Sequence, residues 1–268
     1  MKALDKKKKI AIIAAAAVLL LIILVAVVFK QSKSSNPYGG EIKSVIQEAD
    51  VSEIGDTLRA AGLSNVDLFE TWVYEYHENK NKDFKSNAYS DPDCRMTSML
   101  LLDDQISCEG AEEYTGDYLM IDVDKIENED TYLFIRDNLQ VFTTLFGETA
   151  IPGGGMKDAL PENWKEHGIK VFNKNASLVS LMFTTEDGKE VFTGHTGVLI
   201  DCSKLPDSKY ENYLFVEKLA FEEAFMATEL SDPSGLIDLF SQRPDYTTEE
   251  NEPKPLVYVN DEFIGELK

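Results

Sequence analysis

One uninterrupted apolar segment decides which compartments this chain can occupy. Residues Ile10–Phe29 form a run of twenty apolar residues without a polar side chain. As a helix, the run is about 30 Å long, which matches the thickness of a bilayer core. Four lysines stand directly before it and favour a cytoplasmic N-terminus. We therefore predict cytoplasmic lysines and a transmembrane anchor within residues 1–30, a polar linker over 31–40 and an extracytoplasmic domain over 41–268.

A cleaved signal peptide is the alternative for this segment. Signal peptides have a shorter apolar region of about 7–15 residues, which ends in a small-residue cleavage site. Here the run is longer and leaves through Val27-Val28-Phe29-Lys30, a poor cleavage site. No cysteine stands at the end of the run to accept a lipid. The sequence therefore favours an uncleaved single-pass anchor in the cell membrane.

The part of the chain after the anchor is strongly acidic. The whole sequence has 48 acidic and 26 basic residues and a formal charge of −22. The first 33 residues hold seven lysines and one acid, so the remainder carries 47 acidic and 19 basic residues. Such a surface repels phosphate backbones, which argues against nucleic-acid binding. Acidity by itself names no substrate.

Hydrophobic patterning predicts an α+β domain, with a helical N-terminal part followed by an antiparallel sheet. The helical signals are segments opened by Asp50, by Asn65 and by Asp91-Pro92-Asp93-Cys94, and segments over 132–146 and 161–167. The strand signals are a hairpin over 177–184 and 191–201, a stretch over 213–221 and a final pair around Asn260-Asp261. A short helix is predicted after Asp232-Pro233.

Cys94 is the predicted nucleophile. With Asp91 as cap and Pro92 as first helical residue, its thiol falls in a first helical turn, where free N–H groups and the dipole lower a thiol pKa. The alternatives are a buried small residue or a disulfide with Cys108. A helix from Cys94 to Ile106 would hold these two thiols about 20 Å apart, whereas a disulfide needs Cα atoms within about 7 Å. That pairing is therefore disfavoured.

His195 is the predicted general base, and Glu217 is predicted to orient it. His195 lies mid-strand and is flanked by Gly194 and Gly197. Glycine inside a strand often marks the close approach of a ligand or another backbone. Glu217 is an acid among the core residues of a later strand. Antiparallel pairing in direct register would bring both side chains to one sheet face, and a slip by one residue would separate them.

The other two histidines and the short acidic motifs predict no chemistry. His77 ends a charged helix, where we expect it to be solvated, and His167 lies in a last helical turn, where a cation suits the dipole. Asp122-Val123-Asp124 resembles the start of a calcium loop but lacks the required glycine and glutamate. The sequence has no H-E-x-x-H helix and no paired C-x-x-C. We therefore predict neither a metal nor another cofactor.

Three stretches carry a resemblance to a known family. They are Cys94-Arg95-Met96-Thr97, Gly194-His195-Thr196-Gly197-Val198-Leu199 and Leu214-Phe215-Val216-Glu217-Lys218-Leu219. They resemble an uncharacterised family of Gram-positive surface lipoproteins, catalogued as domain of unknown function 4300, from about residue 41 to the C-terminus. The resemblance implies an extracytoplasmic location and assigns no activity. The order of cysteine, histidine and acid is also similar to that of the papain-like NlpC/P60 cell-wall peptidases.

The chain departs from its family at three positions near these motifs. The resemblance implies Asn directly before the cysteine, where this chain has Asp93. It also implies Pro and Gln after the third motif, where this chain has Ala224 and Met226. A carboxylate next to a thiol opposes thiolate formation. These departures weaken the expectation of catalysis in this member.

Two functions remain after the sequence alone. The first is a membrane-anchored, thiol-dependent hydrolase of peptide or amide bonds, with Cys94, His195 and Glu217 as its catalytic residues. The second is a non-catalytic surface module that binds a cell-wall component or a partner protein. An open cleft with converging polar groups around Cys94 would favour the enzyme, and an apolar or blocked one would favour the module.

Overall fold

A computed structural model describes residues 42–43, 46, 50–81, 91–220, 223–249 and 252–268. The chain divides into two compact units, Met1–Pro37 and Tyr38–Lys268, and all described residues belong to the second. The predicted anchor over 10–29 and the linker over 31–40 lie outside the described residues. Within the described ranges, no helix has the length and apolar character needed to cross a bilayer.

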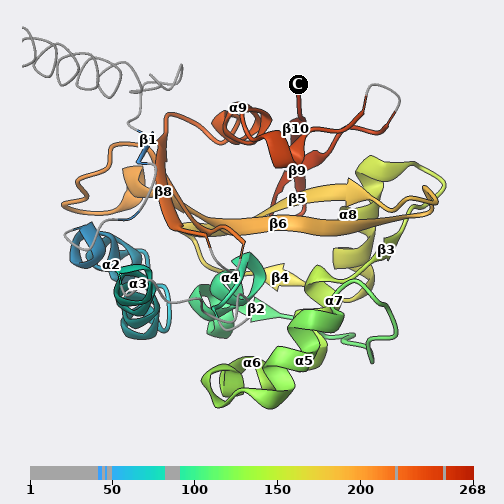
Figure 1. Ribbon diagram of the computed structural model, residues 1–268. Coiled ribbons are helices and arrows are strands. Elements are labelled where there is room, and N and C mark those ends of the chain that lie inside the picture. Colours follow the sequence, from blue (N-terminus) through green and yellow to red (C-terminus); the bar gives the residue numbers. More distant parts are fainter. Residues whose placement is uncertain (1–41, 44–45, 47–49, 82–90, 221–222, 250–251) are drawn as a thin grey trace, which may run out of the picture. The chain divides into compact units, whose positions relative to one another are not determined.

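The second unit is built on one antiparallel sheet (Figure 1). The strands run in the order β1-β8-β7-β6-β5-β9-β10, and β3 pairs with one end of β6. Their bounds are β1 (Ile42–Lys43), β3 (Thr149–Ala150), β5 (Ala176–Thr184), β6 (Glu190–Asp201), β7 (Tyr213–Lys218), β8 (Phe225–Leu230), β9 (Leu256–Val259) and β10 (Glu262–Glu266). A separate small sheet pairs β2 (Ile106–Ser107) with β4 (Lys170–Val171).

Helices lie on both sides of this sheet. Their bounds are α2 (Val51–Ala60), α3 (Val66–Asn81), α4 (Cys94–Leu102), α5 (Met120–Asn128), α6 (Leu133–Arg136), α7 (Leu139–Phe146), α8 (Met156–Glu166) and α9 (Gly235–Ser241). In Figure 1, α9 lies on one side of the sheet and α2 to α7 lie on the other. The predicted α+β class with an antiparallel sheet is therefore confirmed.

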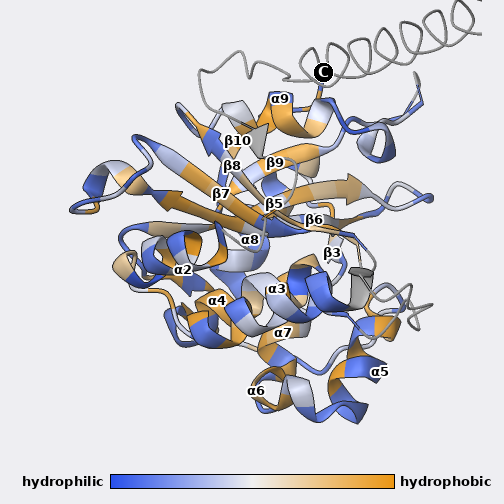
Figure 2. Ribbon diagram, turned by 60° about the vertical axis from the view of Figure 1, so that its left-hand side comes forward, coloured by the Kyte–Doolittle hydropathy of each residue, from blue (hydrophilic) through white to orange (hydrophobic). Residues whose placement is uncertain are grey.

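Alternate strand residues fill two separate cores. Val198 and Val216 are buried against the helices α2 to α8, whereas their neighbours Leu199 and Phe215 are buried against α9. Successive side chains of a strand point to opposite faces, so a sheet covered on both faces needs apolar residues at nearly every position. Figure 2 accordingly shows the central strands as largely hydrophobic and the hairpin ends as hydrophilic.

The helix α8 begins earlier than the sequence predicts. It starts at Met156 and holds Pro161 in its interior, whereas the expected short helix over 161–167 has this proline at its start. An internal proline leaves the carbonyl four residues earlier without its N–H partner. That carbonyl belongs to Lys157, and it accepts a hydrogen bond of 3.0 Å from the Tyr258 hydroxyl in β9. A contact from another part of the chain therefore supports the longer helix.

Two further elements differ from the predictions. The helix expected over 132–146 is divided into α6 and α7. The strand expected over 213–221 ends at Lys218, and the chain then returns as β8, which the sequence analysis does not predict. β8 has Ala and Glu within it, which are uncommon in strands, and its pairing with β7 outweighs this weak local signal.

Candidate functional site

Cys94 is the first residue of α4. The helix is capped by Asp93, whose carboxylate accepts a hydrogen bond of 2.8 Å from the N–H of Met96. The sequence analysis assigns the cap to Asp91 and the first helical position to Pro92, and both assignments are wrong by two residues. Asp93 has the extended backbone of a capping residue, so its side chain reaches the free N–H groups of the first turn. The thiol lies at a helix start, as predicted.

His195 follows a β-bulge in β6. Leu181 of β5 pairs with His195 and the next residue, Met182, pairs with Thr193, which leaves Gly194 as an extra residue. A bulge strengthens the local twist and changes the direction of the side chains next to it. The bulge therefore sets the direction in which the His195 side chain projects from the sheet.

The two glycines beside His195 are explained by neighbouring aromatic rings. A Cβ atom at Gly194 would lie 2.4 Å from the ring of Phe183, and one at Gly197 would lie 2.6 Å from the ring of Phe215. The sequence analysis ascribes these glycines to the approach of a ligand or another backbone. At Gly197 the close approach of another backbone is confirmed, because a Cβ there would also lie 2.8 Å from the carbonyl oxygen of Val216. At Gly194 the ring of Phe183, from the adjacent strand β5, fills the space instead.

His195 and Glu217 project from the same face of the sheet and are in contact. Glu217 Oε2 lies 2.5 Å from His195 Nε2. The carboxylate also binds Arg243 through both guanidinium ends, at 2.8 Å to Nη1 and 2.5 Å to Nη2. Arg243 comes from the segment directly after α9, on the far side of the sheet from Cys94's helix. The sequence predicts the pair, and the structure adds the arginine that completes it.

The charges of this trio follow from burial and pairing. Burial acts to raise the pKa of Glu217, but the Arg243 guanidinium and the hydrogen bonds to it and to His195 lower that pKa to about 2. Burial lowers the pKa of His195, and Glu217 opposes this only in part. The imidazole is therefore neutral and the carboxylate is ionised near neutral pH, as a general base and its orienting residue require.

The thiol of Cys94 is not activated in the way the sequence predicts. Its side chain is buried, and burial followed by the charge of Asp93 raises its pKa to about 12. Arg95 opposes this rise. The expected lowering of the pKa by the helix terminus is therefore corrected: a carboxylate occupies the same terminus. Cys94 is a neutral thiol in the unliganded protein.

Arg95 ties three elements together next to this thiol. Its Nε lies 2.6 Å from Asp122 of α5 and its Nη2 lies 3.0 Å from Asp93. Its Nη1 donates to the carbonyl of Thr193 in β6 at 3.1 Å. Burial and the nearby Asp93 raise the pKa of Asp122 to about 7. The sequence analysis assigns no role to Asp122, because its calcium-loop motif is incomplete. In the structure, its carboxylate binds Arg95 next to Cys94.

The raised pKa of Asp122 predicts a pH dependence of stability. A carboxyl group that binds its proton more tightly when folded stabilises the fold below its unfolded pKa, and this stabilisation is lost as pH rises through the folded value. We expect wild type to lose free energy of unfolding relative to Asp122→Asn as pH rises from about 4 to about 7. Urea unfolding of both proteins across this range measures the difference. A pH-independent difference would contradict the prediction.

Cys94, His195 and Arg243 line one cavity of about 370 Å³. The other residues around it are Asp93, Arg95, Tyr118, Gly194, Leu219, Ala220, Glu223, Pro244, Asp245 and Tyr246. Among the described residues, no hydrogen bond joins the Cys94 sulfur to His195. The cavity combines aromatic and apolar walls with several converging polar groups, which is the composition expected of a ligand site.

The remaining cysteines lie away from this cavity. Cys108 is half-buried and its thiol donates to the carbonyl of His167 at 3.6 Å, whereas Cys202 is buried at the end of β6. All three cysteines of the chain are free thiols. Cys108 therefore offers a matched control for experiments on Cys94.

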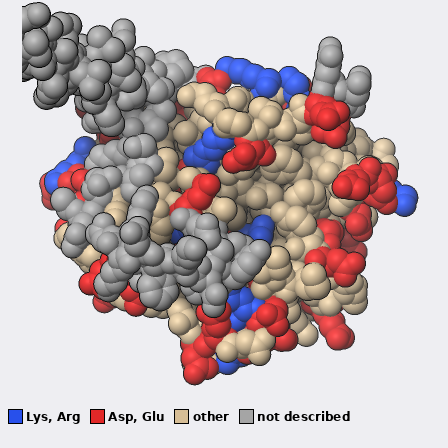
Figure 3. All heavy atoms as spheres, in the orientation of Figure 1, with Lys and Arg blue, Asp and Glu red and all other residues tan. Residues whose placement is uncertain are grey.

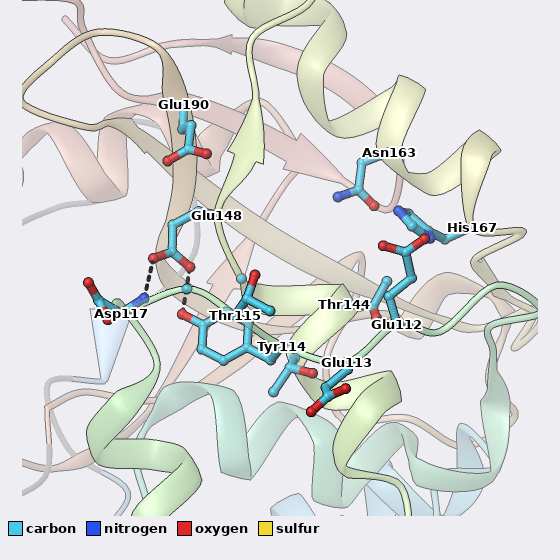
Figure 4. A pocket seen from close by; sticks show the side chains of 13 residues that line it. Glu112, Glu113, Tyr114, Thr115, Asp117, Thr144, Glu148, Asn163, His167 and Glu190 are labelled. Atoms are coloured by element: carbon cyan, nitrogen blue, oxygen red, sulfur yellow. Dashed lines mark hydrogen bonds between the residues drawn. The ribbon is translucent and has the colours of Figure 1, made fainter.

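A second hollow, of about 440 Å³, holds none of the predicted site residues (Figure 4). Acidic residues dominate its walls, among them Glu112, Glu113, Glu148 and Glu190. Glu148 accepts hydrogen bonds from the Tyr114 hydroxyl and from two backbone N–H groups, so it fixes the local loop. In the described part of the chain, no group of three or more His, Cys, Asp or Glu residues is placed to hold a metal ion.

The other histidines have structural partners. His77 Nε2 lies 2.7 Å from the carbonyl of Ile46, so the expectation that it is solvated is wrong. His167 Nδ1 lies 2.7 Å from the carbonyl of Gly110 and fixes the end of α8 to a loop. His195 is therefore the histidine that lines a cavity together with a cysteine.

The fold and site together define an α+β domain with a buried thiol and a carboxylate-bound imidazole on one cavity. The chain matches a family model described as a domain of unknown function, DUF4300, over residues 62–264, and it belongs to this family. The resemblance to domain of unknown function 4300 found in the sequence is thus confirmed over these residues. No curated protein and no solved structure matches the chain.

Proposed function

We propose that this domain is a thiol-dependent hydrolase of peptide or amide bonds. In this proposal the apolar segment over 10–29 anchors it in the membrane of a Gram-positive cell, and its substrates lie outside the membrane. The observation that carries the proposal is the shared cavity of Cys94 and His195, with His195 held by Glu217 and Arg243. A papain-like arrangement of these residues is part of the same proposal.

In the first step the Cys94 sulfur attacks the carbonyl carbon of the scissile bond while its proton passes to His195. A neutral thiol and a neutral imidazole are the starting states, as the raised pKa of Cys94 and the lowered pKa of His195 require. Glu217 stabilises the imidazolium that forms, at its fixed contact with Nε2. The tetrahedral intermediate collapses, the amine leaves with the proton from His195, and the acyl group stays on sulfur as a thioester.

Water then attacks the thioester with His195 again as the base, which releases the acid and restores the thiol. The start of α4 supplies donors for the negative oxygen of both intermediates. The first N–H groups of a helix have no partner within it, and Asp93 takes only that of Met96. No hydrogen bond from the N–H groups of Cys94 and Arg95 to a described residue is present, and both residues line the cavity.

One observation favours the non-catalytic surface module. The Cys94 side chain is only 6% exposed, and its raised pKa leaves almost no thiolate at neutral pH. A buried small residue at a helix start would look the same. The enzyme is preferred because a binding module does not require a histidine that shares the cavity of the thiol and is bound to a carboxylate, which is in turn bound to an arginine.

The test is to trap the acyl group on the full chain in detergent micelles. The protein is incubated with purified peptidoglycan fragments and with a mixture of peptide amides, and released amine and intact mass are both followed. We expect amine release and an acyl adduct that maps to Cys94. Both should be absent from Cys94→Ala and unchanged in Cys108→Ala. If wild type binds the fragments but releases no amine and forms no acyl adduct, the hydrolase is refuted and the binding module is supported.

A further inference from the structure

We propose that the cavity beside Cys94 accepts substrates that carry a positively charged group, an ammonium or a guanidinium, which Glu223 and Asp245 recognise at its rim. This inference rests on the proposed hydrolase function and names the substrate class of that site. Three features carry it. The arginines in the cavity wall are paired with acids, the acids at the rim form no ion pair with a described lysine or arginine, and the chain as a whole is strongly acidic.

The arginines in the cavity wall are already paired. Arg243 is bound through both ends by Glu217, and its guanidinium also lies 5.5 Å from the ring centre of Tyr246. Arg95 is held between Asp93 and Asp122. Each positive charge in the wall therefore faces at least one buried carboxylate. Neither is available to neutralise an anionic substrate.

Lys218, at the end of β7, does not line the cavity. Lys218 is fully buried, and its ammonium group donates to the backbone carbonyls of Ala220 and Glu223 at 2.7 and 2.5 Å. The ammonium also lies 5.4 Å from the ring centre of Phe225. It holds the backbone of the loop after β7 in place, and it is not among the residues that line the cavity. This loop is what brings Glu223 to the rim.

The two acids at the rim differ from the arginines in the wall, because they have no ion-pair partner among the described residues. The side chains of Glu223 and Asp245 are exposed and line the cavity from two different segments. Neither carboxylate forms an ion pair with a lysine or arginine in the described part of the chain. Tyr118 also lines the cavity, but its ring is already occupied by the guanidinium of Arg95, 5.4 Å from the ring centre. The rim thus offers two free negative charges and no free positive one to a ligand.

The net charge of the chain acts in the same direction. After residue 33 the chain carries 47 acidic and 19 basic residues. In the space-filling view, acidic side chains gather on the right-hand side of the face shown, with few basic ones among them (Figure 3). A field of one sign raises the local concentration of oppositely charged ligands and speeds their association. Cationic substrates are therefore favoured both in approach and in binding.

The test measures the potential at the rim without any need for turnover. Ala220 is exposed and lines the cavity, so Ala220→Cys places a reporter thiol there in a full chain that also carries Cys94→Ala, Cys108→Ala and Cys202→Ala. Its thiolate is modified by two methanethiosulfonates of similar size, one with a trimethylammonium group and one with a sulfonate. In each reaction a disulfide forms, the sulfur–sulfonyl bond breaks and methanesulfinate leaves. Intact mass gives both rates.

We expect the cationic reagent to react at least about tenfold faster than the anionic one. Glu223→Gln with Asp245→Asn should lower this ratio about fivefold or more. The matched control is Glu162→Gln with Glu262→Gln, which removes the same net charge at exposed positions outside the cavity and should change the ratio less than twofold. Equal ratios in the rim and control variants would overturn the proposal.

A second measurement separates this inference from the hydrolase. On the chain with its native cysteines, peptide amides that differ only in Lys, Gln or Glu next to the scissile bond are compared by kcat/KM. Preference for Lys that disappears in the rim variant supports both proposals. If the rim variant lowers the rate ratio of the reporter thiol but no peptide is hydrolysed, the cation site is supported and the hydrolase is refuted. If the three peptides are hydrolysed with equal kcat/KM, the hydrolase is supported and the cation site is refuted.

Discussion

Arg243→Ala is expected to lower the free energy of unfolding by about 3–5 kcal/mol, the cost of removing one partner of a buried ion pair. The Glu217 side chain is fully buried, and Arg243 is the cation that binds both of its oxygens. Without Arg243, the carboxylate and His195 must together take up one proton or leave a buried charge uncompensated. Urea unfolding followed by circular dichroism measures the loss.

The matched control for this prediction is Arg59→Ala. Arg59 also contacts both oxygens of a glutamate, Glu70, but its side chain is 40% exposed. Exposed pairs contribute about 0–1 kcal/mol, so the control should lose little stability. A second variant separates charge from packing: adding Glu217→Gln to Arg243→Ala should recover part of the loss. Equal losses in Arg243→Ala and Arg59→Ala would refute the account of the buried pair.

The Arg243→Ala variant also has a predicted pH dependence. The pKa of Glu217 is about 2 in wild type because Arg243 favours the ionised form. Without Arg243, burial raises the pKa of the carboxyl group above its unfolded value, so the fold keeps its stability at low pH and loses it as pH rises. The stability difference between wild type and variant should therefore be smaller near pH 4 than near pH 8. A constant difference would show that lost packing, not charge, causes the loss.

Asp93→Asn is expected to raise the alkylation rate of Cys94 by about 10- to 100-fold, since each pKa unit changes the thiolate fraction tenfold. Asparagine keeps an oxygen that can accept the N–H of Met96, so the helix cap is preserved. It removes the charge that, after burial, contributes most to the raised pKa of Cys94. Burial remains, so the pKa stays above that of a free cysteine.

Iodoacetamide labelling at pH 8, with the modified peptide identified by mass spectrometry, measures this change. Cys108 serves as the internal reference in each sample, because it lies outside the cavity. Asp137→Asn is the control variant: it removes one exposed negative charge at the end of α6, and we expect unchanged labelling of Cys94. If Asp93→Asn labels Cys94 no faster than wild type, burial alone sets the reactivity of the thiol.

Local patterns were enough to predict the parts of the site that lie on regular elements. The spacing predicts a cysteine at a helix start, and strand periodicity predicts that Glu217 and His195 share one sheet face. Their contact also depends on the register, which pairs Val198 with Val216 and so lies two residues from the direct register expected for His195 and Glu217. The cap was misplaced because Asp91 and Asp93 are both acceptable capping residues, and only the backbone conformation distinguishes them.

The parts of the site that depend on distant segments could not be predicted. Arg243 is 26 residues from Glu217 in sequence and belongs to a short turn with no periodic signal. The raised pKa of Cys94 depends on burial, which results from the packing of α4 against β6 and β7. The ring that fills the space beside Gly194 could not be predicted for the same reason, since Phe183 comes from the neighbouring strand β5.

The position of Arg243 after α9 has a consequence for the biogenesis of the protein. During synthesis, β6 and β7 are made before the arginine, so the Glu217 carboxylate has no guanidinium partner until the segment after α9 has been made and has packed against the sheet. The thiol-bearing helix is translated earlier still. A growing chain therefore carries the cysteine, the histidine and the acid before the arginine that completes their arrangement, and the site is assembled only when the last part of the domain has folded.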